Sequence, residues 1–259
     1  MEKERLKNYL NDGLSTRDIQ NITGLHRNTI SYWIKKHNLT ESMKFKKNES
    51  FSFEEIDSKE KAYCLGFILA DGAISKDKIE ISVAMDDKEV LEFISKIINA
   101  NVNYDFSYDK VSKRFPRART HKKIEDITKF IGGSLKESRH FPRVRKDLQK
   151  YLLLGVFDAD GCITWGYRKD RNRLWHKITF SSSLKILTGV QQYLYKELNI
   201  STIVRPKSGE NCSILEFANK KDILVFLNHI YSDMDFIILK RKQLKAEALR
   251  LKLGEFGET

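Results

Sequence analysis

Two stretches of the sequence decide the fold: AYCLGFILADGAI at residues 62–74 and YLLLGVFDADGCI at residues 151–163. They align without a gap at an offset of 89 residues. The corresponding positions include Gly66 with Gly155, Ala70 with Ala159, and Asp71 with Asp160. A repeat of this kind indicates a duplicated structural unit.

Each stretch has the pattern of a helix with small residues on one face. Gly66 and Ala70 are four positions apart, as are their counterparts, so they predict two helices that approach each other closely. The glycines that follow, Gly72 and Gly161, are expected to end each helix in the left-handed conformation.

An aspartate ends each of the two expected helices. A carboxylate at a helix C-terminus costs about 0.3–1 kcal/mol, and two carboxylates brought together also repel each other. A shared divalent cation would offset this cost, and without a suitable His or Cys set the hard oxygen ligands favour Mg²⁺ or a similar ion. The alternative is that Asp71 and Asp160 are two solvated helix ends.

The segments CLGFILADG and LLGVFDADG resemble the motif of the LAGLIDADG homing endonucleases. The resemblance implies two motif helices side by side, with a metal set of Asp71, Asp160, Gly72 and Gly161 beside the scissile phosphates. Leu69 departs from the motif at its sixth place, where the second copy has Asp158. We interpret Leu69 as a change in packing.

The same order of elements is expected after each motif. In the first half we predict strands at 73–75, 78–85, 102–108 and 114–120, and helices at 87–98 and 124–131. In the second half we predict strands at 162–168, 177–181, 202–205 and 213–217, and helices at 184–198 and 222–230. The fold class is therefore α+β: a pseudo-twofold pair of αββαββα units whose antiparallel sheets form a saddle-shaped surface.

The net charge of +12 favours a polyanionic partner. Basic residues on the expected strands and hairpin loops are candidates for DNA contacts, because a two-stranded ribbon can enter the major groove. They are Arg117, Arg119, Arg168, Arg171, Arg173, Lys177, Arg205 and Lys207. The family resemblance also implies a catalytic lysine before the final helix, which corresponds to Lys240, and a counterpart at Lys136.

The N-terminal segment has a different pattern. GLSTRDIQNITGLHRNTISYWIKKHNL at residues 13–39 resembles a helix-turn-helix, with a helix from Ser15 to about Ile22, a turn at Gly24 and a second helix at residues 27–36. A protein-interaction module is the alternative. The resemblance implies DNA contacts by residues on the second helix, namely His26, Arg27, Asn28, Thr29, Tyr32, Lys35 and Lys36.

These features predict a helix-turn-helix domain at residues 1–40, a linker at 41–58 and a tandem domain at 59–259, whose halves are 59–145 and 146–259. Three widely spaced cysteines suggest neither a disulfide framework nor a zinc site. No stretch is long and apolar enough to cross a membrane, and we expect a cytoplasmic protein.

The function that follows is a metal-dependent, site-specific endonuclease acting on double-stranded DNA. Two motifs in one chain predict a monomer. A catalytically inactive transcription regulator and an intron RNA maturase, which share this fold, remain alternatives.

Overall fold

The computed structural model describes residues 2–11, 16–39, 53, 55–75, 78–98, 100–108, 114–122, 127–171, 173–207 and 212–255. The chain forms two compact units, Met1–Phe51 and Ser52–Thr259. None of the described helices is long and apolar enough to cross a membrane.

The described residues of the smaller unit form three helices, α1 (Lys3–Asn11), α2 (Thr16–Thr23) and α3 (Arg27–Lys36). Their apolar faces meet in a small core of Leu6, Leu10, Ile19, Ile30, Ile34 and Leu39. Gly24 has φ +71°, which supplies the turn expected between α2 and α3. Ser15, the expected first residue of the α2 region, lies outside the described residues.

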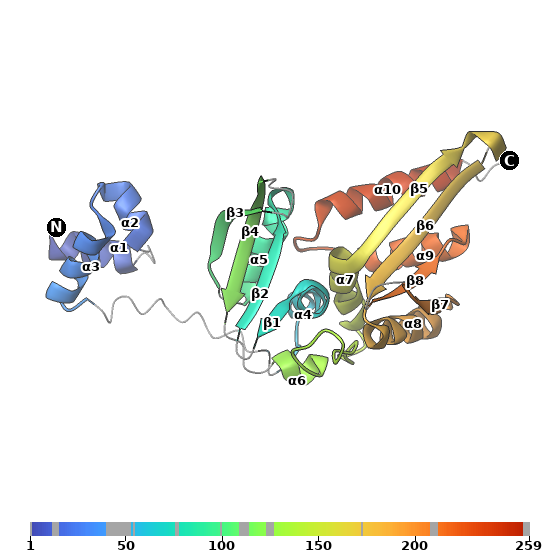
Figure 1. The fold of residues 1–259 in the computed structure, drawn as a ribbon, viewed down its shortest axis with the longest axis horizontal. Coiled ribbons are helices and arrows are strands. Elements are labelled where there is room, and N and C mark those ends of the chain that lie inside the picture. Colours follow the sequence, from blue (N-terminus) through green and yellow to red (C-terminus); the bar gives the residue numbers. More distant parts are fainter. Residues whose placement is uncertain are drawn as a thin grey trace. The chain divides into compact units, whose positions relative to one another are not determined.

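The first half of the larger unit begins with the helix that carries the first motif (Figure 1). Its elements are α4 (Lys59–Asp71), β1 (Ala73–Ser75), β2 (Lys78–Ala84), the short helix η1 (Met85–Asp87), α5 (Lys88–Ile97), β3 (Val102–Tyr108), β4 (Arg114–Lys122) and α6 (Ile127–Ile131). The strands form an antiparallel sheet in the order β1-β2-β4-β3. The predicted start of the last helix at residue 124 lies outside the described residues.

The second half repeats this order. Its elements are α7 (Gln149–Asp160), β5 (Gly161–Arg168), η2 (Lys169–Arg171), β6 (Arg173–Ser182), α8 (Leu184–Leu198), β7 (Ile203–Pro206), β8 (Ser213–Phe217), α9 (Lys220–Tyr231) and the additional helix α10 (Lys240–Glu255). The sheet order β5-β6-β8-β7 matches that of the first half. The two halves therefore share one topology.

The motif helices α4 and α7 pack against each other at the centre of the larger unit, with a sheet on either side (Figure 1). Gly66 and Gly155 make this contact close. A Cβ atom at Gly66 would lie 2.1 Å from the carbonyl oxygen of Leu152, and one at Gly155 would lie 2.1 Å from that of Tyr63. Both glycines thus face the backbone of the opposite helix, as the small-residue pattern predicts.

The expected left-handed conformation of Gly72 and Gly161 is wrong. Their φ values are −68° and −88°, and both residues are extended, because a strand begins directly after each helix. Glycine is required at both positions because there is no room for a Cβ atom. A Cβ at Gly72 would lie 2.5 Å from the carbonyl oxygen of Ile68, and one at Gly161 would lie 2.4 Å from the carbonyl oxygen of Phe157.

The segment interpreted as a linker contributes to the core of the larger unit at its end. Phe53 and Ile56 are buried there, 2% and 8% exposed. The Ser58 hydroxyl then caps α4 by accepting a hydrogen bond from the Lys61 amide. The packed part of the unit therefore begins before residue 59, while most of segment 41–58 lies outside the described residues.

Candidate functional site

Asp71 and Asp160 are the last residues of the two motif helices, and the packing of α4 against α7 brings them together. Part of the Asp71 side chain faces solvent. The protein around its carboxylate and the negative charge of Asp160 nevertheless both raise the pKa of Asp71. The two carboxylates are thus close enough to repel, as the sequence pattern predicts.

The carboxylate of Asp160 is the more enclosed of the two, with 11% of the side chain exposed. Its Oδ2 is buried and has no hydrogen-bond partner in the described structure. A buried carboxylate oxygen without a hydrogen-bond partner is unusual, and it suits a hard divalent cation. Among the described residues, however, no group of three or more His, Cys, Asp or Glu forms a cation site.

Lys136 lies next to this pair. Its Nζ is 3.6 Å from Asp160 Oδ2, and its positive charge lowers the pKa of Asp71 in opposition to burial and Asp160. The structure therefore places Lys136 beside both aspartates. Lys240, by contrast, is the exposed first residue of α10 and forms no ion pair with either aspartate in the described part of the chain.

Lys242, which the sequence reasoning missed, is buried at the end of α7, with 4% exposed. Its Nζ donates hydrogen bonds of 2.6 Å to the carbonyl oxygens of Phe157 and Asp158. Burial lowers the pKa of Lys242 to about 8, and the charge of Asp158 opposes this shift. A signal for its burial is in the sequence: Lys242 falls in the same helical stripe as the buried Ala246 and Leu249.

Asp158, at the sixth place of the second motif, is 1% exposed. Its Oδ2 accepts hydrogen bonds from the hydroxyl of Tyr63 at 2.8 Å and from the amide of Leu239 at 3.0 Å. Burial raises the pKa of Asp158 to about 6. This side chain connects α4, α7 and the segment before α10. The corresponding residue of the first motif, Leu69, is fully buried.

A second buried cation, Arg139, lies at the end of α4, with 3% exposed. Its Nη1 donates to the carbonyl oxygen of Leu69 at 3.1 Å, and its Nη2 donates to that of Ser134 at 2.9 Å. The sequence reasoning missed this residue too. Each motif helix thus has a buried basic side chain at its C-terminal carbonyls.

Four of the six candidate DNA-binding residues of the second half, Arg168, Arg173, Lys177 and Arg205, occupy strand positions on one face of the sheet. Directly opposed residues of an antiparallel pair point to the same side. The pairs Ile163–Ile178 and Gly161–Phe180 lie on the buried side, so the alternate pairs lie on the opposite side. These are Thr164 with Lys177 and Arg168 with Arg173 on β5–β6, and Arg205 with Ile214 on β7–β8.

Lys177 is already paired on this face. Its Nζ lies 2.9 Å from Oε2 of Glu216, and both side chains are 39% exposed. The other two candidates, Arg171 in η2 and Lys207 after β7, lie at strand ends, and the side chains of Arg171 and Arg173 lie outside the described residues.

In the first half, positions 117 and 119 of β4 pair with Ala84 and Ser82 of β2. Ala84 and Ser82 alternate with Ile81 and Val83, which are buried. Arg117 and Arg119 therefore occupy register positions equivalent to the open face, although nothing of their side chains is described.

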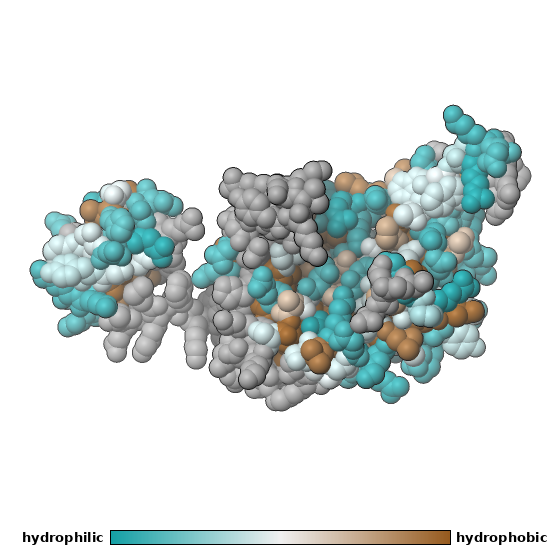
Figure 2. All heavy atoms as spheres, viewed as in Figure 1, coloured by the Kyte–Doolittle hydropathy of each residue, from teal (hydrophilic) through white to brown (hydrophobic). Residues whose placement is uncertain are grey.

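In the smaller unit, α3 has a continuous exposed face, and hydrophilic side chains dominate this unit in Figure 2. His26 caps the helix, because its Nδ1 accepts a hydrogen bond of 3.3 Å from the Asn28 amide. Lys36 Nζ lies 4.8 Å from the centroid of the Trp33 ring. The exposed residues of this face include all seven candidates: His26, Arg27, Asn28, Thr29, Tyr32, Lys35 and Lys36.

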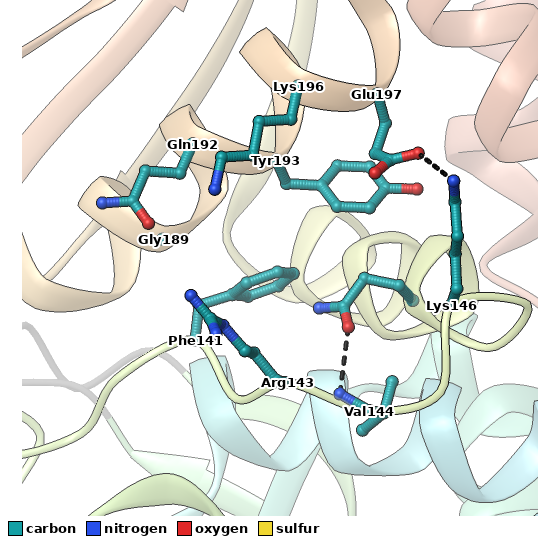
Figure 3. Close-up of a pocket in the computed structure, with 10 residues that line it drawn as sticks. Phe141, Arg143, Val144, Lys146, Gly189, Gln192, Tyr193, Lys196 and Glu197 are labelled. Atoms are coloured by element: carbon teal, nitrogen blue, oxygen red, sulfur yellow. Dashed lines mark hydrogen bonds and ion pairs between the residues drawn. The ribbon is translucent and has the colours of Figure 1, made fainter.

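A cavity of about 250 Å³ lies elsewhere, between α8 and the segment that precedes α7 (Figure 3). Tyr193 and Lys196 line it from α8, and Phe141 and Arg143 line it from the opposite side (Figure 3). None of the predicted site residues lines this cavity. It is therefore not part of the candidate active site.

Comparisons with known proteins support the fold. Residues 147–231 match the family model of the LAGLIDADG-like domain. The structure is similar to the homing endonuclease I-WcaI bound to its DNA recognition sequence, with a TM-score of 0.54 and 15% identity over 86% of this chain and 96% of that one. No sequence among the curated proteins matches the chain.

A second solved structure is also similar: the I-LtrWI LAGLIDADG homing endonuclease bound to target DNA. Its TM-score is 0.53, with 11% identity over 77% of this chain and 91% of that one. At such identities the likeness concerns the fold. Residues 147–231 are therefore similar to the LAGLIDADG-like domain, and the chain has a fold similar to that of the LAGLIDADG homing endonucleases.

Proposed function

We propose that this protein is a site-specific endonuclease that cuts both strands of double-stranded DNA, with Asp71 and Asp160 holding Mg²⁺ or a similar divalent ion. The observation that carries the proposal is the meeting of the two carboxylates at adjacent helix ends, where Asp160 Oδ2 is buried without a hydrogen-bond partner. The fold similarity to endonucleases that were solved on DNA supports it.

The residues around the pair fit hydrolysis of a phosphodiester. A divalent cation bound there would polarise a phosphoryl oxygen and make a bound water more acidic. Asp71 and Asp160 supply hard oxygen ligands, to which the carbonyls of Gly72 and Gly161 are candidate additions. Lys136 Nζ lies 3.6 Å from Asp160 Oδ2. Its positive charge would stabilise the negative charge that develops on the phosphate during hydrolysis.

The open sheet faces are the proposed DNA-binding surface. We take the two halves as a pseudo-twofold pair that presents a saddle-shaped surface to the duplex. The basic residues Arg168, Lys177 and Arg205 of the second half share one face, which a ribbon in the major groove requires. Arg117 and Arg119 occupy the equivalent face in the first half.

The smaller unit is proposed to be a helix-turn-helix domain that adds a second DNA contact through α3. Its supporting features are the turn at Gly24 and the exposed residues at the start of the helix, Arg27, Asn28 and Thr29. Replacing Arg27 and Thr29 by alanine is expected to weaken binding to a selected site and to leave the cleavage positions unchanged. Gel-shift titrations and mapping of the cut ends measure the two effects.

The test of the nuclease proposal begins with selection of cleaved sequences from a randomised duplex library in Mg²⁺. Asp71→Asn and Asp160→Asn are then assayed on the selected site, with Asp147→Asn as control, since Asp147 pairs with Arg145 at the surface. We expect each active-site variant to lose double-strand cleavage and the control to retain it. Full cleavage by both active-site variants would exclude the mechanism.

The same assay separates the endonuclease from a regulator and tests the oligomeric state. Recovery of bound sequences but of no cleaved sequences from the same library, in Mg²⁺ or Mn²⁺, would favour an inactive regulator. Because both halves of the proposed site belong to one chain, we propose a monomer, which light scattering of the full chain tests directly.

A further inference from the structure

The C-terminal ends of the two motif helices are both covered by buried cations. The last carbonyl groups of a helix lack intrahelical partners and carry partial negative charge. Lys242 donates to the carbonyls of Phe157 and Asp158 at the end of α7, of which the Phe157 carbonyl also accepts the Gly161 amide, and Arg139 donates to the Leu69 carbonyl at the end of α4. Both cations are more than nine-tenths buried. Their charged groups therefore interact with the helix ends and not with solvent.

The covered carbonyls lie directly before the aspartates. Lys242 bonds Phe157 and Asp158, which are three and two residues before Asp160. Arg139 bonds Leu69, which is two residues before Asp71. Each cation thus fixes the last helical turn from which one of the two carboxylates projects.

The two cations come from separate segments. Lys242 belongs to α10, after the second half, and Arg139 lies after α6, in the first half. Each half therefore supplies the cation that fixes its own motif helix. The surroundings differ: Asp158 and Tyr63 form a buried hydrogen bond at the α7 end, whereas the corresponding position at the α4 end is the apolar Leu69.

We propose that Lys242 and Arg139 are positioning residues, that Lys242 orients Asp160 and Arg139 orients Asp71, and that each therefore controls hydrolysis of one DNA strand. This inference rests on the proposed function. Both residues are buried, so neither is expected to contact DNA directly. A misplacement of about 1 Å at a reacting group lowers rates on the order of 100-fold, so loss of one cation is expected to slow one strand far more than the other.

The experiment compares Lys242→Met and Arg139→Met in the full chain on a duplex labelled separately on each strand. Methionine keeps a long apolar chain and removes the charge. Each variant is expected to slow cleavage of one strand on the order of 100-fold and to accumulate nicked DNA, with opposite strands nicked by the two variants. Lys245→Met, an exposed change in α10, and Arg143→Met, an exposed change beside the cavity, are the matched controls.

A second measurement does not depend on cleavage. Amide hydrogen exchange in the free protein should become faster at residues 157–161 in Lys242→Met and at residues 68–72 in Arg139→Met, with the other helix end unchanged. If the wild-type chain cleaves nothing, the proposed function fails, while the exchange pattern still tests the positioning roles.

Equal slowing of both strands by either variant, or unchanged exchange at both helix ends, would overturn the inference. If the methionine variants do not fold, Lys242→Arg and Arg139→Lys retain the charge with altered geometry. A strand bias of several-fold in these variants supports the positioning roles, and equal rates on the two strands refute them.

Discussion

The hydroxyl of Tyr63 on α4 donates a hydrogen bond of 2.8 Å to the carboxylate of Asp158 on α7. At the offset of 89 residues, Tyr63 of the first half corresponds to Leu152 of the second half, and Asp158 of the second half corresponds to Leu69 of the first half. Both leucines are fully buried. Asp158 thus has a hydroxyl donor on α4, whereas the positions that correspond to the two members of this pair are both apolar, which is consistent with leucine at the sixth place of the first motif.

Restoring the acidic residue of the motif in the first half is expected to destabilise the protein. The Leu69→Asp carboxylate would be buried opposite Leu152, without the hydroxyl donor that Asp158 has, and should lower the free energy of unfolding by about 3 kcal/mol. Adding Leu152→Tyr should recover about 1–2 kcal/mol. Urea unfolding of the two single variants and the double variant measures this coupling, and strictly additive effects would contradict it.

The close contact of α4 and α7 predicts that Gly66→Ala destabilises the protein much more than Gly254→Ala, a change at an uncrowded helical glycine. A Cβ at Gly66 would lie 2.1 Å from a backbone oxygen of α7, whereas Gly254 has nothing within 4 Å. We expect Gly66→Ala to cost about 3 kcal/mol and Gly254→Ala to be neutral or to stabilise by up to about 1 kcal/mol. Thermal unfolding of both variants tests the difference.

The raised pKa of Asp158 predicts a pH dependence of stability. Its pKa rises from 3.8 to about 6 on folding, so the folded state binds this proton more tightly than the unfolded state. The contribution of Asp158 to stability is therefore present below about pH 4 and is lost as the pH rises through 6.

Asp158→Asn removes this dependence. Relative to wild type, the variant should gain up to about 3 kcal/mol between pH 4 and pH 6.5, since a shift of one pKa unit corresponds to about 1.4 kcal/mol. Denaturant unfolding in chelator at several pH values measures the gain. A constant difference over this range would contradict the prediction.

The ion pair of Lys177 with Glu216 predicts that removing the negative charge and removing the positive charge change DNA binding in opposite directions. Glu216→Gln releases the lysine for a phosphate, and it should tighten binding and make the slope of log affinity against log salt steeper by about 1. Lys177→Gln should make the slope shallower by a similar amount. Fluorescence anisotropy at several salt concentrations measures both slopes.

Glu197→Gln is the matched control, because Glu197 pairs with Lys146 beside the cavity and not on the sheet face. An equal change of slope in the control would show that net charge, and not the position of Lys177, is responsible.

Much of the fold follows from local signals in the sequence. The repeated small residues predict the contact of α4 with α7, and Gly66 and Gly155 make it. Strand and helix periods give most elements within a few residues. The start of β6 was expected at Lys177 but lies at Arg173, because residues 173–176 continue the pairing with β5 up to Arg168. This pairing depends on a neighbouring strand and not on the period of β6 itself.

The candidate site is predictable only in part. The aspartates follow from the repeat, and Lys136 lies beside them. Lys242 and Arg139 depend on carbonyl groups of helices far away in the sequence, and a single chain gives no local signal for such partners. The conformation of Gly72 and Gly161 was wrong because the rule for helix ends assumes a reversing turn, whereas here a strand follows at once.

The unlike pairs at the helix interface also determine how the halves can associate. A homodimer of the second half would place Asp158 of each copy opposite Leu152, with the hydroxyl donor missing on both sides. A homodimer of the first half would bury two Tyr63 hydroxyls opposite Leu69. Each missing hydrogen-bond partner of a buried polar group costs about 1–3 kcal/mol. At this interface each half is therefore more complementary to the other half than to a second copy of itself.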